Sequence, residues 1–204
     1  METASPHETA ASLVEMLNTK GQGDYIGEPI SQLAHSLQAA HLARTNSDDE
    51  ELIIAALLHD IGQFLPADEI KRLAHNVCEM DAQGGSVGRV GHERIGDAYL
   101  VRLGFSRRVG ALVASHVPAK RYLCAVDPAY HATLSEASQA SLRYQGGPMS
   151  GTELQEWAGN PWCTDMCRMR KWDDAAKVVG LDVPPAEAYL GMIERHLARE
   201  NVEQ

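Results

Sequence analysis

The stretch Leu57-Leu58-His59-Asp60-Ile61-Gly62 joins an apolar run to an imidazole, a carboxylate and a glycine. The run follows the acidic residues 48–51, which favour the start of a helix through the helix macrodipole. We expect Gly62 to end this helix, because glycine is common just past a helix C-terminus. The sequence therefore predicts a helix whose last turn presents two metal-ligand side chains, His59 and Asp60.

Apolar residues recur at helical spacing along almost the whole chain, whereas the alternation typical of strands is hard to find. The pattern predicts an all-α fold in which Ser31 and Ser106 cap helices. Pro118 is expected to end a helix and to leave His116 at its C-terminal end, and the glycine-rich residues 84–88 predict a flexible loop. The expected helices span residues 9–19, 32–44, 50–61, 66–74, 91–103, 107–117, 135–144, 161–179 and 185–199.

The length of 204 residues fits one domain, residues 1–204, which can build a core without disulfides or a structural metal. Acidic residues outnumber basic ones by 28 to 18, and the formal net charge of −10 disfavours binding to nucleic acid or to an anionic membrane. We therefore expect a small molecule as the partner, and a chemical role for any bound metal.

The four cysteines, Cys78, Cys124, Cys163 and Cys167, form no regular disulfide framework. Reduced thiols suit a cytosolic protein. The N-terminal residues lack the basic and apolar regions of a signal peptide, and no stretch approaches the roughly 18 apolar residues of a membrane span. The sequence therefore predicts a soluble, cytoplasmic protein.

Histidines and carboxylates recur on or at the ends of several expected helices, and a helical bundle brings such positions to a common centre. Imidazoles and carboxylates suit iron, manganese, zinc or nickel, and a carboxylate beside a histidine can bridge two ions. From spacing alone His75 competes with His92, because both lie between Asp60 and His116. The candidate metal ligands are His35, His59, Asp60, His92, His116 and Asp173.

These ligands and several longer motifs carry a resemblance to a known family. The pattern His35…His59-Asp60…Asp173 resembles the HD-domain superfamily of all-helical metalloproteins, most of which are phosphohydrolases. With two more histidines the chain resembles the mixed-valent diiron oxygenase branch, closest to the dioxygenases of 2-amino-1-hydroxyethylphosphonate and of its trimethylammonio relative. The motifs are residues 24–28 (DYIGE), 31–38 (SQLAHSLQ), 55–62 (AALLHDIG), 116–123 (HVPAKRYL), 145–149 (QGGPM) and 170–174 (RKWDD).

The resemblance implies an HD-domain helical bundle and a non-heme diiron oxygenase of phosphonate catabolism. The expected reaction uses O2 as cosubstrate to cleave the C–P bond of a 1-hydroxy-2-(amino or trimethylammonio)ethylphosphonate. Its products are phosphate and glycine or glycine betaine. Asp60 would bridge an Fe(II)/Fe(III) pair, in which one iron is held by His35, His59, Asp60 and Asp173 and the other by His92 and His116.

The same resemblance implies roles for residues around the metals. Lys120 is the expected phosphonate cation and a catalytic residue. Ser138 is a second, weaker phosphonate contact. Tyr25 resembles a tyrosine that occupies an iron position until substrate arrives, which makes it the other expected catalytic residue. Glu28 would move with Tyr25 and face the substrate amine.

Gln63 departs from the family pattern, in which a histidine follows His-Asp-Ile-Gly. Glutamine keeps a hydrogen-bonding side chain at this substrate-binding position but removes an acid–base group. A trimethylammonium substrate would need carboxylate and aromatic contacts, for which Tyr122, Trp162 and Trp172 are further candidates. The residues also fit two other functions, a metal-dependent phosphohydrolase and a metal-binding regulatory domain without enzymatic activity.

Overall fold

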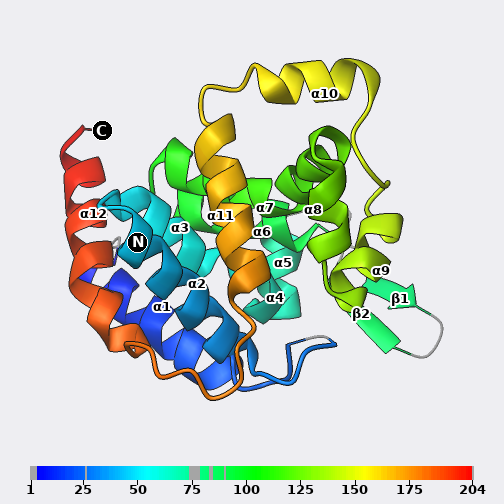
Figure 1. Cartoon of the computed structure of the whole chain (residues 1–204). Helices are drawn as coiled ribbons and strands as arrows, with labels where there is room; N and C mark the ends of the chain where they lie inside the picture. The colour runs from blue at the N-terminus through cyan, green and yellow to red at the C-terminus, as the bar shows by residue number, and fades with distance from the viewer. Residues whose placement is uncertain (1–3, 26, 74–78, 83–84, 90, 204) are drawn as a thin grey trace.

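The structure, a computed structural model, describes residues 4–25, 27–73, 79–82, 85–89 and 91–203. Helices dominate these residues, as the apolar periodicity predicted, and they assemble into a bundle (Figure 1). The elements are α1 (Pro6–Lys20), α2 (Gln32–Asn46), α3 (Glu50–Leu58), α4 (Ile61–Phe64), α5 (Ala67–Leu73), β1 (Glu79–Ala82), β2 (Gly85–Arg89), α6 (His92–Arg102), α7 (Arg107–Val126), α8 (Pro128–Thr133), α9 (Glu136–Tyr144), α10 (Gly151–Ala158), α11 (Cys163–Ala175), the 3-10 helix η1 (Ala186–Tyr189) and α12 (Leu190–Glu203).

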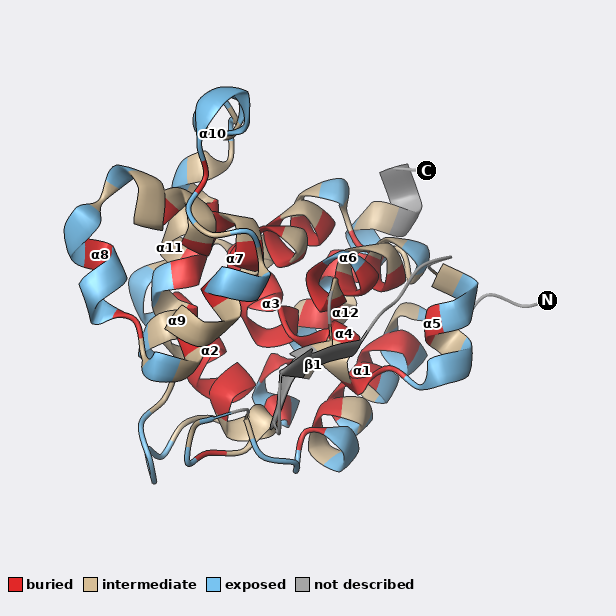
Figure 2. Ribbon diagram, turned by 90° about the vertical axis from the view of Figure 1, so that its right-hand side faces the viewer, coloured by how far each residue is buried: buried red, intermediate tan, exposed pale blue. Residues whose placement is uncertain are grey.

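Helix α3 lies in the middle of the bundle, and its residues 52–58 are all buried (Figure 2). Asp49 begins this helix, because its carboxylate accepts hydrogen bonds from the backbone N–H groups of Glu51 and Leu52. Helices α2, α7, α11 and α12 pack against α3. A helix that is apolar on every face needs such neighbours on all sides, so α3 brings the helices around it to one centre.

The helix before the His59-Asp60 pair ends earlier than the sequence predicted. Helix α3 stops at Leu58, and Gly62 lies inside the separate short helix α4. Gly62 permits a close approach, because a Cβ atom at this position would lie 2.0 Å from the backbone oxygen of His92. Its missing side chain therefore lets α4 touch α6, and the contact brings His92 next to the pair.

Pro118 does not end its helix, although the sequence predicted that it would. Helix α7 continues to Val126 with Pro118 in its interior. The proline removes one helical N–H donor, but Val117, Ala119 and Leu123 around it are buried in the bundle, which holds the helix together. His116 therefore lies in mid-helix, one turn before Lys120.

Several other elements differ from the prediction. Strands β1 and β2 pair antiparallel where a loop over residues 84–88 was predicted; residue 84 lies outside the described residues. Helix α8 was not predicted, and α10 projects from the bundle (Figure 1). Helix α11 ends at Ala175 rather than at residue 179. The predicted caps Ser31 and Ser106 are confirmed, since each accepts a hydrogen bond from a first-turn N–H group.

Helices α1 and α12 pack against each other at one side of the bundle (Figure 1). None of the described helices combines the length and the apolar character that crossing a bilayer requires.

Candidate metal centre

One group of ligand atoms, here called cluster 1, comes from α2, the end of α3 and α11. It consists of His35, His59 and Asp173, which are all buried and whose ligand atoms lie within 4.8 Å of one another. Nε2 of His35 lies 3.1 Å from Nε2 of His59 and 3.2 Å from Oδ1 of Asp173. The packing of α2 and α11 against α3 thus converts three distant positions in the sequence into one buried site.

A second group, cluster 2, contains Asp60, His92 and His116. Nε2 of His92 lies 2.9 Å from Nε2 of His116 and 3.2 Å from Oδ1 of Asp60. The other oxygen of Asp60, Oδ2, lies 3.4 Å from Nε2 of His59 in cluster 1. The Asp60 carboxylate therefore faces both clusters, one oxygen to each.

The four imidazoles of the two clusters share one orientation. In each ring, Nδ1 lies 2.8–2.9 Å from a backbone carbonyl oxygen. A carbonyl can only accept a hydrogen bond, so Nδ1 carries the proton and Nε2 presents its lone pair to the cluster. The pairs are His35 with Ala176, His59 with Ala56, His92 with Arg89 and His116 with Val113.

This arrangement fits a metal ion in each cluster. Two lone pairs that face each other at 2.9–3.1 Å repel unless a proton or a cation lies between them. Oδ1 of Asp173 is buried without a hydrogen-bond partner among the described residues, and a buried carboxylate oxygen of this kind is a natural metal ligand. Imidazole and carboxylate donors suit first-row transition metals such as iron, manganese or zinc.

When no metal ion is bound, protons supply the positive charge between the facing ligand atoms. Burial by itself lowers the pKa of His59, but Asp60 outweighs this effect and the pKa rises to about 9. Burial and the neighbouring His92 lower the pKa of His116 to about 3. Burial opposes ionisation of Asp60, yet His59 and His92 hold its pKa well below the usual range. The centre thus keeps an ionised carboxylate and attracts cations.

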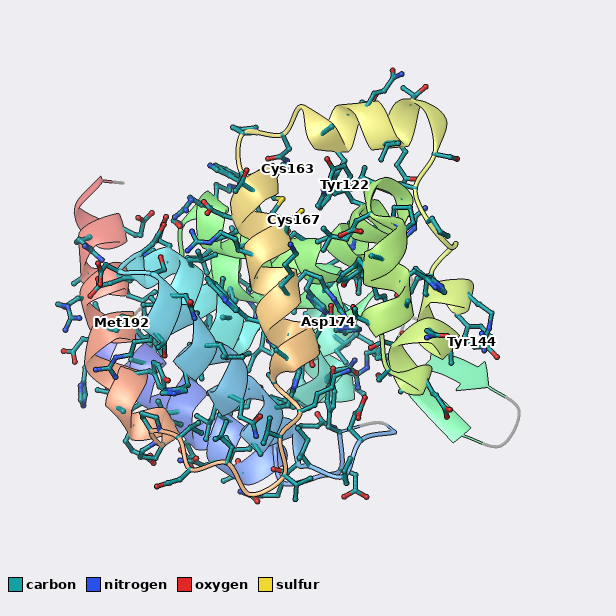
Figure 3. All side chains as sticks on the ribbon, viewed as in Figure 1. Tyr122, Tyr144, Cys163, Cys167, Asp174 and Met192 are labelled. Carbon is teal, nitrogen blue, oxygen red and sulfur yellow. The ribbon has the colours of Figure 1, made fainter. Side chains whose placement is uncertain are left out.

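Arg170 holds the cluster 1 carboxylate, a role that the residue-by-residue assignment from the sequence missed. Its Nη1 donates to Oδ2 of Asp173 at 2.7 Å, and its Nε donates to Oδ2 of Asp174 at 3.1 Å. Asp174, labelled near the end of α11 in Figure 3, also accepts a hydrogen bond from Tyr130. The spacing of three residues between Arg170 and Asp173 on one helix was the available signal.

A pocket of about 90 Å³ opens onto both clusters. Its wall includes four of the candidate metal ligands, Asp60, His92, His116 and Asp173. All of the expected substrate contacts also line it, namely Tyr25, Glu28, Gln63, Lys120 and Ser138. The structure therefore brings every candidate site residue to one place, since His35 and His59 lie directly behind this wall.

Lys120 is buried beside the pocket. Its Nζ donates to the hydroxyl oxygen of Ser141 at 2.7 Å and to the backbone oxygen of Ser138 at 3.4 Å. Burial and the nearby Arg170 lower the pKa of Lys120 to about 7. Ser138 thus contacts Lys120 through its backbone, whereas its hydroxyl accepts a hydrogen bond from Lys177.

Tyr25 and Glu28 belong to a loop that an isolated bridge between Asp24 and Ser31 closes. The Tyr25 ring stacks on the His35 ring of cluster 1, with 3.8 Å between centroids and 18° between planes. Burial, together with nearby carboxylates of both clusters, raises the pKa of Tyr25 well above its usual value. The phenol therefore keeps its proton in the metal-free protein.

Gln63 is held by the backbone of the last residue of strand β2. Its Oε1 accepts the backbone N–H of Arg89 at 3.1 Å, and the carbonyl of the same residue accepts Nδ1 of His92. Because Oε1 is engaged, the amide NH2 group is the part of Gln63 that can donate to a ligand. The departure from the family pattern thus supplies a hydrogen-bond donor beside cluster 2.

The three other aromatic residues that the sequence offered as ammonium contacts do not line the pocket. Tyr122 packs near Trp157, Trp172 lies under the guanidinium of Arg168, and neither they nor Trp162 are among the described residues that line the pocket. Cys163 and Cys167 lie near the start of α11, far from Asp174 at its end (Figure 3).

His75, the alternative to His92, lies outside the described residues. A third set of potential ligands, Glu51, His196 and Glu200, has competing partners. Nε2 of His196 accepts the backbone N–H of Ser106, and Glu51 pairs with Arg108 at 2.7 Å. We therefore assign no metal to this set.

Comparison with known proteins gives one family and several relatives. The HD domain family model matches residues 33–142. The hydroxymethylphosphonate dioxygenase of Gimesia maris is 43% identical over 190 residues, which cover 93% of this chain and 89% of that protein. The [1-hydroxy-2-(trimethylamino)ethyl]phosphonate dioxygenase (glycine-betaine-forming) of Leisingera caerulea is 36% identical, with 88% and 86% covered. An uncharacterized protein of Acanthamoeba polyphaga mimivirus is 33% identical, with 92% and 81% covered.

Proposed function

The chain belongs to the HD-domain family, and we propose that it is a dioxygenase that cleaves the C–P bond of a 1-hydroxyphosphonate. The names of two relatives support this function, because both substrates carry a hydroxyl group on the carbon attached to phosphorus. Oxidative C–P cleavage in phosphonate catabolism was also the function expected from the sequence. The shared α-hydroxyphosphonate unit is the part of the substrate that we assign to the site.

The single observation that carries the proposal is the Asp60 carboxylate, which faces two buried clusters at the wall of one pocket. Cluster 1 would hold one iron ion and cluster 2 a second one, and Asp60 would be the ligand that the two clusters share. When bound, the two irons supply the Fe(II)/Fe(III) redox chemistry that activates O2. Arg170 orients Asp173, and the four backbone carbonyls orient the imidazoles, as ligands of a metal require.

The other pocket residues bind and orient the substrate. The Lys120 ammonium pairs with the phosphonate, and burial strengthens this pairing because little water screens it. The NH2 group of Gln63 donates to a substrate oxygen next to cluster 2. Tyr25 covers cluster 1 through its stack on His35 and shifts off the metal position when the substrate enters. Glu28 on the same loop moves with it and faces an amino or ammonium substituent of the substrate.

Turnover of hydroxyphosphonates with and without O2 tests this function. Purified protein is loaded with Fe(II) without oxygen, partly oxidised and given hydroxymethylphosphonate or 1-hydroxy-2-(trimethylammonio)ethylphosphonate. We expect O2 uptake in proportion to phosphate release, and an EPR signal of the coupled iron pair that changes on substrate addition. Equal phosphate release without O2 would contradict the dioxygenase. Phosphate release from a phosphomonoester without O2 would instead indicate a phosphohydrolase, for which a metal-bound hydroxide would act as the nucleophile.

A further inference from the structure

Lys177 lies in the pocket wall just after α11, and the sequence assigned it no role. Its Nζ lies 3.1 Å from Oε1 of Glu28, 3.2 Å from Oγ of Ser135 and 3.1 Å from Oγ of Ser138. An ammonium group has three N–H donors, so these three acceptors satisfy it completely. Lys177 is thus a cation for which the protein has built a full set of partners.

The segment around Lys177 is fixed to the metal centre. The carbonyl of Ala176 accepts Nδ1 of the cluster 1 residue His35 at 2.9 Å. On the other side, the side-chain amide of Gln38 pairs with both the N–H and the carbonyl of Val178, at 2.9 and 2.7 Å. Helix α2 therefore holds the backbone before and after Lys177, and its side chain extends from a rigid base.

The partners of Lys177 are the groups that would recognise an ammonium on a substrate. Glu28 supplies a carboxylate, and the Tyr25 ring has its centroid 5.8 Å from Nζ of Lys177. A carboxylate and an aromatic face together form a binding site for a substituted ammonium. We call Glu28 and Tyr25 the cation site. The ammonium group of Lys177 already occupies it.

We propose that Lys177 determines substrate specificity by occupying the cation site with its own ammonium group, so that 1-hydroxyphosphonates with a cationic substituent compete with it and uncharged ones do not. This inference rests on the proposed function and narrows its substrate class. A cationic substrate must enter beside Lys177 or displace it, and both are costly where the side chains of Lys177 and Glu28 are only 12% and 13% exposed. In the first case like charges meet, and in the second the displaced ammonium loses Glu28 and two hydroxyl acceptors.

A different role for Lys177 would be to bind the phosphonate together with Lys120, since both contact Ser138. The two roles predict different effects of removing the charge. If Lys177 bound the phosphonate, its loss would weaken every substrate to a similar extent. If it occupies the cation site, its loss frees Glu28 and favours only the cationic substrates.

The test compares Lys177→Met with the wild type on hydroxymethylphosphonate and on 1-hydroxy-2-(trimethylammonio)ethylphosphonate. Both kcat/KM and the dissociation constant are measured, the latter by calorimetry without O2. For each protein, the value for the trimethylammonio substrate is divided by the value for hydroxymethylphosphonate. We expect this ratio to be about tenfold or more higher in Lys177→Met than in the wild type, both for kcat/KM and for affinity. An unchanged ratio, or an equal loss for both substrates, overturns the proposal.

Further variants make the result specific. Lys177→Arg keeps the charge and should keep the wild-type ratio. If Lys177→Met folds poorly, Lys177→Gln removes the charge, keeps a hydrogen-bonding group and should raise the ratio in the same way. Glu28→Gln added to Lys177→Met should abolish the gain, because the freed carboxylate is its cause. Lys20→Met, at an exposed position in α1, should change nothing. If the wild type binds phosphonates but consumes no O2, the proposed function is wrong. The ratio of the two substrate affinities still tests the role of Lys177 in that case.

Discussion

Oδ1 of Asp60 lies 3.2 Å from Nε2 of His92, while Oδ2 of the same carboxylate lies 3.4 Å from Nε2 of His59. One side chain is therefore shared by two sites that could otherwise bind metal independently. This geometry makes metal content a direct test, because the two clusters should respond differently to the loss of a shared ligand and of an unshared one.

His92→Ala should remove the cluster 2 ion and leave the cluster 1 ion, because it deletes one of three donors in cluster 2 alone. Asp60→Ala should lower the occupancy of both. The measurement is iron per protein after anaerobic loading and desalting, by elemental analysis. His131→Ala, at an exposed position in α8, is the control and should match the wild type. Full metal content in His92→Ala would exclude His92 as a ligand and would make His75 the candidate in its place.

Lys120 should impose a pH dependence on stability. Its pKa of about 7 in the folded protein lies below the usual 10.5, so between these values the unfolded chain binds more protons and stability rises with pH. Lys120→Met lacks this effect. The wild type should therefore gain free energy of unfolding relative to Lys120→Met by about 1 kcal/mol or more between pH 7 and 9.

The Lys120 comparison is made by urea denaturation of the metal-free proteins at several pH values. Contributions from the buried histidines cancel in the difference between the two variants, as long as their pKa values do not change. A difference that stays constant from pH 7 to 9 would show that Lys120 remains charged throughout.

Gly62→Ala should destabilise the protein by about 2 kcal/mol or more, because its Cβ atom would lie 2.0 Å from the backbone oxygen of His92. The same displacement of α6 should lower iron binding in cluster 2. Gly191→Ala in α12 is the matched control; its Cβ atom would be 3.6 Å from the nearest side-chain atom. It should stabilise the protein by about 0.5 kcal/mol. Thermal unfolding that ranks the two variants equally would contradict the close-approach argument.

Arg170→Lys should weaken iron binding by about tenfold or more without removing any ligand atom. Lysine keeps the charge but loses the planar fork that reaches Asp173 and Asp174 together. Competition with a metal chelator measures the affinity. Arg121→Lys, which alters a pair with Glu153 outside the pocket, should leave the iron affinity unchanged. Equal affinities for both variants would mean that Asp173 needs no such support.

The fold class and the ligand types could be predicted from the sequence because they depend on local patterns. The apolar run before His59 predicts a helix, and buried helices around it bring distant histidines together. Pro118 shows the limit of local rules: proline usually ends a helix, yet burial on both sides of it keeps α7 continuous.

The sequence could not place residues whose roles depend on contacts across the bundle. Lys177 meets Glu28 across 149 positions of the chain, and no periodicity links them. Gln38 holds Val178 in the segment after α11, but nothing in the sequence distinguishes it from an ordinary helix residue. Arg170 differs, because its spacing from Asp173 on one helix was visible before the structure was known.

The continuity of α7 through Pro118 has a consequence for regioselectivity. Four residues separate His116 from Lys120, and at a rise of about 1.5 Å per residue they lie about 6 Å apart along the helix axis. A continuous helix cannot adjust this spacing to the substrate. Under the proposed function, the enzyme should therefore accept a hydroxyl group on the carbon next to phosphorus and leave 2-hydroxyalkylphosphonate isomers intact, since their phosphonate and hydroxyl groups are one carbon further apart.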